Sequence, residues 1–313
     1  MTWSTQQNWR LCANCQGLWL PGHLTPSACP AGGTHTETGS ANYSLIVDAS
    51  SAPGQSGWRR CDKCHGLWFG NSAAAATCPL GGTHSAVGSG NYTMSIGGPG
   101  QRDWRSCSRC GGLWFAGGGS AGTCPAGGTH DPSGSADISV VRVQSAVRIH
   151  TKVLVAPTTV SVETMLQNMR DVYAAGEIDV QWMSNEILSL PDLEDLEAGK
   201  CRLGVTTQEQ DDLFAHRTGV GPDEIVVYFV RSTLPPYNGC ASHPSGRPGA
   251  VVVQTASQWT FAHEVGHVLG LRHVDDNDRL MTGNGTSKIT NPPPDLVASE
   301  ITTMNSSALT VDV

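Results

Sequence analysis

One stretch of eleven residues constrains the fold of this 313-residue chain more than any other. It spans residues 263–273 and reads H-E-V-G-H-V-L-G-L-R-H. Because side chains four residues apart lie on the same face of an α-helix, His263 and His267 are expected to direct two imidazoles at one metal ion, with Glu264 beside them. The alternative is a buried helix whose histidines only satisfy hydrogen bonds in the core. The spacing favours a helix that carries half of a metal site.

The rest of that site requires the chain to turn back after the helix. Gly270 can adopt the left-handed conformation that ends a helix, so that His273 approaches the same metal ion. Three neutral imidazoles then fill three of the four tetrahedral positions of a zinc ion, and a water molecule takes the fourth. Glu264 is placed to accept a proton from this zinc-bound water. Residues 255–258 read T-A-S-Q, which is a capping-box pattern and predicts that the helix begins there.

A methionine lies eight residues beyond the third histidine, at Met281. The pattern H-E-x-x-H-x-x-G-x-x-H followed by a methionine turn resembles the metzincin clan of zinc endopeptidases. The resemblance implies that Glu264 is the general base and that Met281 forms a turn beneath the metal. We describe it as matrixin-like with the subfamily left open, because Val274 matches no subfamily marker and no tyrosine follows Met281.

A repeated unit fills the first half of the chain, in three copies. Each copy reads C-x2-C-x13-C-x5-H and is preceded by Trp-Arg. Closed disulfide pairing would leave one of three thiols unpaired in every copy, whereas three cysteines and one histidine complete a tetrahedral site for structural zinc. Disulfides, or a redox role for the C-x2-C pairs, are the alternative. The predicted ligands are Cys12, Cys15, Cys29 and His35, then Cys61, Cys64, Cys78 and His84, then Cys107, Cys110, Cys124 and His130.

Each repeat also carries two tryptophans, which are its largest apolar side chains. We interpret them as small cores around each zinc ion; an exposed aromatic platform for a glycan, a cell surface or a peptide is the alternative. Residues 1–137 carry seven Lys/Arg and six Asp/Glu, a balance that argues against a nucleic-acid partner. The sequence does not distinguish repeats that stack, close into a ring or hang as separate beads. The tryptophan pairs are Trp9 with Trp19, Trp58 with Trp68, and Trp104 with Trp114.

Composition divides the chain into two domains, because cysteine- and glycine-rich sequence gives way to ordinary hydrophobic alternation near residue 142. Residues 1–142 form the repeats, at about 1–49, 50–99 and 100–142, and residues 143–313 form a metallopeptidase domain. The predicted fold class is α+β: three small β-rich units stapled by zinc, then a metzincin-like mixed, twisted sheet with the zinc helix. The resemblance places a strand at 249–254 on the edge of that sheet. Further strands are expected at 147–155, 178–182 and 224–230, and helices at 161–173, 208–216 and 295–305.

Two cysteines lie outside the repeats, at Cys201 and Cys240. We predict a disulfide between them, which would close a loop of about forty residues and contribute about 3–4 kcal/mol in the chain-entropy model. Two free buried thiols are the alternative. Asp275, Asp276 and Asp278 follow the third histidine. They are interpreted as a solvated turn, with calcium binding as the alternative.

The expected function is hydrolysis of peptide bonds by a zinc metalloendopeptidase that holds one catalytic and three structural zinc ions, with the repeats as a targeting or regulatory module. The alternative is a binding or adhesion protein whose repeats engage a surface or partner and whose peptidase fold is a scaffold. A third hypothesis is that the repeats inhibit or gate the cleft. Residues 138–313 carry twelve Lys/Arg and twenty-one Asp/Glu, which favours basic or neutral substrates.

The N-terminal segment has neither the basic patch nor the apolar core of a secretory signal peptide. No run of eighteen apolar residues predicts a membrane span. We expect a monomer that is secreted or exported by a route without a classical signal peptide, because metzincins usually act outside the cell. A cytoplasmic location is the alternative, since zinc-bound thiolates tolerate a reducing interior.

Overall fold

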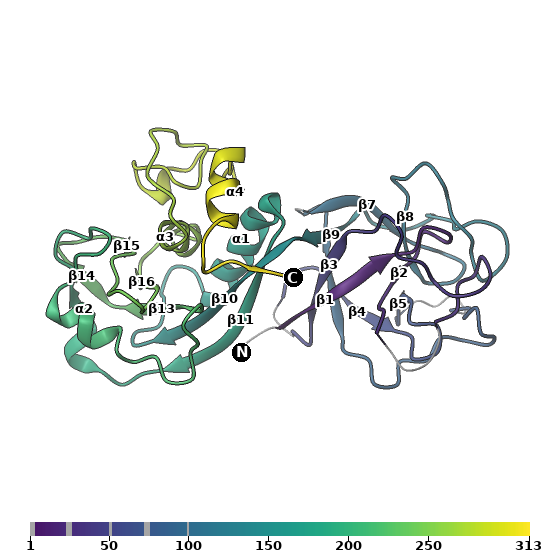
Figure 1. Ribbon diagram of the computed structural model, residues 1–313, viewed down its shortest axis with the longest axis horizontal. Coiled ribbons are helices and arrows are strands. Elements are labelled where there is room, and N and C mark those ends of the chain that lie inside the picture. The colour runs from purple at the N-terminus through teal and green to yellow at the C-terminus, as the bar shows by residue number, and fades with distance from the viewer. Residues whose placement is uncertain (1–3, 23–26, 50–51, 72–75, 99) are drawn as a thin grey trace. The chain divides into compact units, whose positions relative to one another are not determined.

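A computed structural model describes residues 4–22, 27–49, 52–71, 76–98 and 100–313. The chain forms two compact units, one that ends at Val143 and one that runs from Gln144 to Asp312 (Figure 1). The predicted α+β class is confirmed, and within the described ranges the helices all belong to the second unit. None of the helices in these ranges has the length and apolar content that a membrane span requires.

Each repeat of the first unit contributes three strands. Its first strand pairs antiparallel both with a short strand that follows the C-x2-C knuckle and with the strand that ends the repeat. The predicted β-rich repeats are therefore confirmed. The strands are β1 (Ser4–Leu11), β2 (Leu18–Trp19) and β3 (Asn42–Val47), then β4 (Gln55–Arg60), β5 (Leu67–Phe69) and β6 (Tyr92–Ile96), then β7 (Gln101–Ser106), β8 (Leu113–Phe115) and β9 (Ile138–Val143).

The three repeats close into a ring. Strands β3, β6 and β9 pair antiparallel with one another, each using one half of its length for each neighbour. A second set of backbone bridges joins the glycine after each knuckle to a tryptophan of another repeat: Gly17 to Trp114, Gly66 to Trp19, and Gly112 to Trp68. Every repeat contacts both others. The repeats therefore form a ring, and not the stack or the separate beads that the sequence also allowed.

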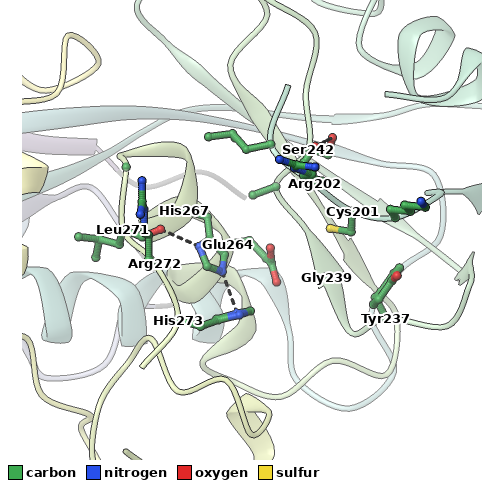
Figure 2. Close-up of a pocket in the computed structure, with 14 residues that line it drawn as sticks. Cys201, Arg202, Tyr237, Gly239, Ser242, Glu264, His267, Leu271, Arg272 and His273 are labelled. Atoms are coloured by element: carbon green, nitrogen blue, oxygen red, sulfur yellow. Dashed lines mark hydrogen bonds between the residues drawn. The ribbon is translucent and has the colours of Figure 1, made fainter. Parts of the chain in front are cut away.

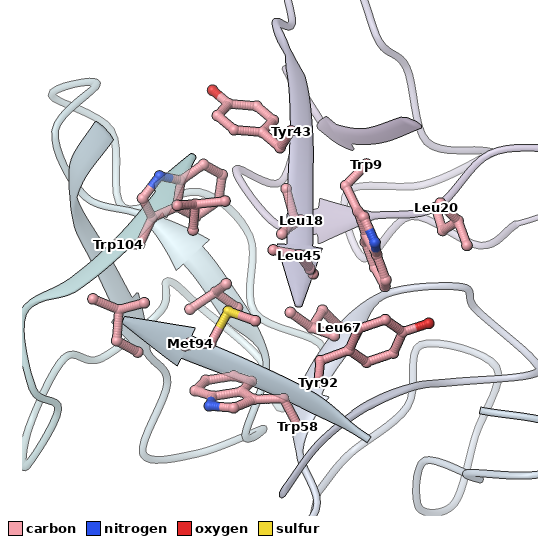
Figure 3. Packing of buried hydrophobic residues seen from close by; sticks show 13 residues of the cluster. Trp9, Leu18, Leu20, Tyr43, Leu45, Trp58, Leu67, Tyr92, Met94 and Trp104 are labelled. Carbon is pink, nitrogen blue, oxygen red and sulfur yellow. The ribbon is translucent and has the colours of Figure 1, made fainter. Parts of the chain in front are cut away.

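The first tryptophan of each repeat lies in one core that all three repeats share. Trp9, Trp58 and Trp104 are fully buried in a single cluster (Figure 3). Trp9 packs edge-on against Tyr92 of the second repeat at a centroid distance of 5.1 Å, and Trp104 against Tyr43 of the first at 5.3 Å. For these three residues the prediction of separate small cores around each zinc ion was wrong, because the ring brings their indoles to a common centre.

The second tryptophans lie at the predicted metal sites. Trp19, Trp68 and Trp114 stack on the histidine of their own repeat, with ring centroids 5.1 to 5.4 Å apart. Trp19 and Trp114 are buried and Trp68 is half-buried. The six tryptophans therefore form no exposed aromatic platform. They give no support to the alternative that a glycan or a cell surface binds to such a platform.

The second unit is built on a twisted sheet whose strands lie in the order β11, β10, β13, β16, β15. The first four are parallel, and β15 runs antiparallel to β16. The strand predicted at 249–254 is β16, but its placement on the sheet edge was wrong, because Gly239 and Cys240 pair outside it. The strands are β10 (Ser145–Val153), β11 (Ile178–Ile187), β13 (Ile225–Val230), β15 (Gly239–Cys240) and β16 (Gly249–Val253).

Smaller elements complete the unit. Strand β17 (Val311–Asp312) pairs with β10, and β12 (Asp195–Glu197) pairs in parallel with β14 (Ser232–Leu234).

Helix α2 ends sooner than the helix predicted at 208–216. Its bounds are Gln208–Leu213, and 3-10 turns occur at Ala174–Gly176, Pro191–Leu193 and Thr286–Lys288.

Three helices lie on one face of the sheet: α1 (Val162–Tyr173), α3 (Thr260–Val268) and α4 (Ala298–Asn305) (Figure 1). Helix α1 begins where predicted, because the Ser161 side chain accepts a hydrogen bond from the amide of Thr164. It contacts β11 and α3, and α3 contacts β16. The Tyr173 hydroxyl donates to the carbonyl of Ala262 at 2.9 Å. This bond fixes the zinc helix α3 against its neighbour.

The zinc helix begins later than the predicted capping box at 255–258. Its first residue is Thr260, and its N-cap, Trp259, makes no side-chain capping bond. The Ser257 hydroxyl instead donates to Thr286 Oγ1 at 2.7 Å. The capping-box prediction was wrong, because the helix begins two residues beyond Gln258 and neither Thr255 nor Gln258 caps it.

Candidate metal centres

The three histidines of the C-terminal motif converge. Helix α3 supplies His263 and His267, Gly270 takes a φ of +101° just beyond it, and the chain then returns with His273. The three Nε2 atoms lie 3.0 to 3.1 Å from one another. Ligand nitrogens around a tetrahedral zinc ion would lie about 3.3 Å apart. The spacing therefore suits three imidazoles that share one ion.

Hydrogen bonds on the far side of two rings determine which nitrogen faces the centre. His263 Nδ1 donates to the Leu280 carbonyl at 2.7 Å, and His267 Nδ1 donates to the Leu271 carbonyl at 2.9 Å. Because a carbonyl only accepts, each neutral ring carries its proton on Nδ1 and turns the lone pair of Nε2 inward. Lone pairs that meet at this distance repel one another unless a cation lies between them. The donor set thus fits a bound metal ion.

Burial keeps these imidazoles neutral. It lowers the pKa of His263 to about 3, and it also lowers the pKa of His267 and of His273. A neutral imidazole is the form that binds a metal. Glu264 is only 7% exposed, and burial raises its pKa to about 8. The positive charge of a bound zinc ion would oppose that rise.

Gly239 on the edge strand β15 leaves the space that Glu264 occupies (Figure 2). A Cβ at this position would lie 2.6 Å from both Cγ and Oε1 of Glu264. Any side chain at position 239 would therefore displace the carboxylate. No sequence pattern signals this role, because Gly239 lies in an ordinary turn-like segment 25 residues before Glu264.

With Glu264 as the general base that the sequence predicts, replacing Gly239 with Ala should lower kcat for the expected peptide hydrolysis by about 100-fold, because a displacement of about 1 Å at a reacting group has effects of this size. The flexible carboxylate is the group that moves, so we expect zinc content and melting temperature to stay near those of the wild type. The double variant Gly239→Ala with Glu264→Asp is the matched comparison, since a shorter side chain relieves the overlap. A single variant with the wild-type kcat would contradict this role for Gly239.

The segment that carries Met281 packs closely against helix α3. Met281 is fully buried, and a Cβ at Gly266 would lie 2.8 Å from its sulfur. The Val274 amide donates to the Met281 carbonyl at 2.9 Å, and residues 274 and 282 form a bridge. The sequence predicted the methionine but not Gly266, whose missing side chain allows the approach.

The metal site opens into a cavity of about 800 Å³. Its other walls come from residues 200–203, from Tyr237 and from the edge strand with the residues after it (Figure 2). The structure joins Cys201 and Cys240 in a disulfide, which links two of these walls. Neither wall was predicted, because no pattern in 200–203 or 237–242 signals a binding surface.

The repeats bring each predicted set of three cysteines and one histidine together, with all four ligand atoms of a set within 4.8 Å of one another. The first and third sulfurs lie 3.8 to 4.0 Å apart, and the second sulfur lies 3.4 to 3.7 Å from the histidine Nδ1. A tetrahedral zinc ion needs about 3.8 Å and about 3.5 Å for these edges. A hydrogen bond from the second cysteine lowers the pKa of the first, to about 3 in Cys12, 2 in Cys61 and 3 in Cys107. These sets fit structural zinc ions.

The acidic residues after the third histidine form no comparable set. Within the described residues, the groups of three or more potential metal ligands are the histidine centre and the three sets in the repeats. Asp276 accepts a hydrogen bond from the amide of Asp278, and Asp275 accepts one from Asn284. These contacts match the predicted solvated turn and give no support to calcium binding there.

No protein-family model matches the chain, and no curated protein matches it. Among solved structures it is similar to metalloproteinase-II from Bacteroides fragilis, at 16% identity and a TM-score of 0.41, over 51% of this chain and 52% of that chain. It is also similar to an archaemetzincin from Methanopyrus kandleri (15%, TM-score 0.36, 51% and 94%) and to a zinc-dependent peptidase from Methanocorpusculum labreanum (15%, 0.35, 50% and 100%). We identify the metal centre from the geometry of its ligands, because likenesses this distant show no function. The matrixin-like subfamily stays a prediction.

Proposed function

We propose that the chain is a zinc-dependent endopeptidase of the metzincin type. The observation that carries this proposal is the convergence of three Nε2 atoms, 3.0 to 3.1 Å from one another, beside a cavity that His267, His273 and Glu264 line. His263, His267 and His273 would hold the zinc ion. When bound there, zinc polarises a peptide carbonyl and makes water more acidic.

Glu264 then acts as the general base and acid. Its carboxylate takes a proton from the attacking water and delivers it to the leaving amine. Because the carboxylate is buried, bulk water does not compete for this proton, and Gly239 leaves it room to reach the substrate. The edge strand β15 adjoins the cavity through Gly239. A substrate peptide can therefore extend the sheet beside the reacting groups.

The direct test is to incubate the zinc-loaded chain with an unfolded protein in water enriched in ¹⁸O. New C-terminal carboxylates that each carry one ¹⁸O atom would identify hydrolysis, and mass spectrometry would locate the cleaved bonds. A chelator should stop the reaction, and added zinc should restore it. The proposal fails if no new termini form, or if their formation is indifferent to the chelator.

We further propose that the repeat ring targets or regulates the peptidase and that the protein acts in an oxidising compartment. The disulfide between Cys201 and Cys240 supports the compartment, because such bonds persist where thiols are not kept reduced. The ring adds structural zinc sites outside the histidine centre, which fits a module distinct from the catalytic groups.

A further inference from the structure

The cavity beside the three histidines has positively charged walls, although acidic residues outnumber basic ones in the unit as a whole. From residue 144 to 313 the chain has eleven Lys/Arg and twenty-one Asp/Glu. Three of those eleven cations, Lys200, Arg202 and Arg272, nevertheless line the cavity, where Glu264 is the only acidic residue. A charged group acts on a ligand mainly within about 8–10 Å at physiological salt. The walls, rather than the net charge of the unit, therefore determine what the substrate encounters.

These three cations are available to a ligand. All are exposed, and within the described ranges none forms an ion pair or a side-chain hydrogen bond. Other cations of the unit are paired instead: Lys152 with Glu186, Arg231 with Glu194 and Asp195, and Arg279 with Glu300. Three of the unit's unpaired positive charges thus lie at the cavity, in a unit where carboxylates outnumber cations.

The backbone that carries two of these cations is fixed. Lys200 and Arg202 flank Cys201, whose disulfide partner lies on the edge strand. The Ser242 hydroxyl lies 2.9 Å from the carbonyl of Arg202 and 2.6 Å from that of Val205. A segment held in this way can present its charges without the full loss of chain entropy on binding.

The third cation lies on the catalytic side of the cavity. Arg272 directly precedes the ligand His273, and Figure 2 shows it on the His267 side of Glu264, with Arg202 on the opposite side. A peptide bound at Glu264 would therefore pass between positive groups. We propose that this cavity selects peptides with Asp or Glu within two residues of the scissile bond, an inference that rests on the proposed peptidase function. It reverses the preference for basic or neutral substrates that the net charge suggested.

The test uses pairs of quenched fluorescent peptides that differ only by Asp against Asn at each position around the cleaved bond. At one or more positions we expect kcat/KM to be about five- to tenfold higher for the acidic peptide. The ratio should fall towards one between 50 mM and 500 mM NaCl, because salt screens the attraction. It should also fall in Lys200→Gln/Arg202→Gln and in Arg272→Gln. Lys288→Gln, an exposed cation outside the cavity, should keep it.

A binding measurement separates this preference from the peptidase function itself. In the zinc-loaded Glu264→Ala chain, fluorescence anisotropy should show tighter binding of the acidic peptide than of its amide twin. Equal cleavage and equal binding of both peptides would overturn the preference and leave the peptidase function standing. No cleavage of either peptide by the wild type would overturn the function, and the anisotropy ratio would still decide the preference.

Discussion

Glu264→Gln is expected to lower kcat/KM for peptide hydrolysis by about 10²- to 10⁴-fold while the chain keeps its zinc. The amide has nearly the volume of the carboxylate, so the buried position beside Gly239 stays filled. An amide nitrogen or oxygen, however, cannot take a proton from water at neutral pH. The measurement is steady-state hydrolysis of a fluorescent peptide, together with the zinc content of the purified chain.

The matched control for this variant is Asp223→Asn, which neutralises an exposed carboxylate outside the cavity. It should cleave at the wild-type rate, because it alters net charge without touching the site. A second comparison, His267→Ala, should lose one zinc ion per chain together with activity. Wild-type cleavage by Glu264→Gln would show that another group moves the proton.

The histidine centre could be predicted from sequence because its parts lie close along the chain. One helical turn separates His263 from His267, and a single glycine with positive φ brings back His273. The ligand sets in the repeats could also be predicted, since three copies of one spacing identify their ligands. Spacing within a short segment thus carries most of the information about these metal centres.

The cavity could not be predicted in this way, because its walls come from segments that only the fold brings together. Residues 200–203 reach the site through a disulfide and through hydrogen bonds from Ser242. The edge strand was misplaced for a related reason: the two residues Gly239 and Cys240 are too few to give a strand pattern, yet they pair outside β16. The ring closure of the repeats likewise depends on strand pairs between copies, which periodicity within one copy does not reveal.

Cys64→Ala is expected to destabilise the whole repeat ring rather than one third of it. The middle knuckle is bridged to both other repeats, through Gly66 to Trp19 and through Trp68 to Gly112. Structural zinc binding contributes about 10–16 kcal/mol in small zinc-dependent domains, and even a fraction of that should lower the melting temperature of the ring by about 10 °C or more. Zinc per chain should fall from four to three or fewer, as measured on the purified protein by mass spectrometry of the metal.

Leu80→Ala is the control, because Leu80 lies two residues beyond a zinc ligand of the same repeat but is 56% exposed. It should keep four zinc ions and the wild-type melting temperature. Tryptophan fluorescence distinguishes a shared core from independent units, since Trp9, Trp58 and Trp104 pack in one cluster. Their emission should change together in a single transition as the Cys64→Ala ring melts. If two thirds of the signal instead melted at the wild-type temperature, with two ring sites still loaded, the repeats would be independent and the shared core would not govern their stability.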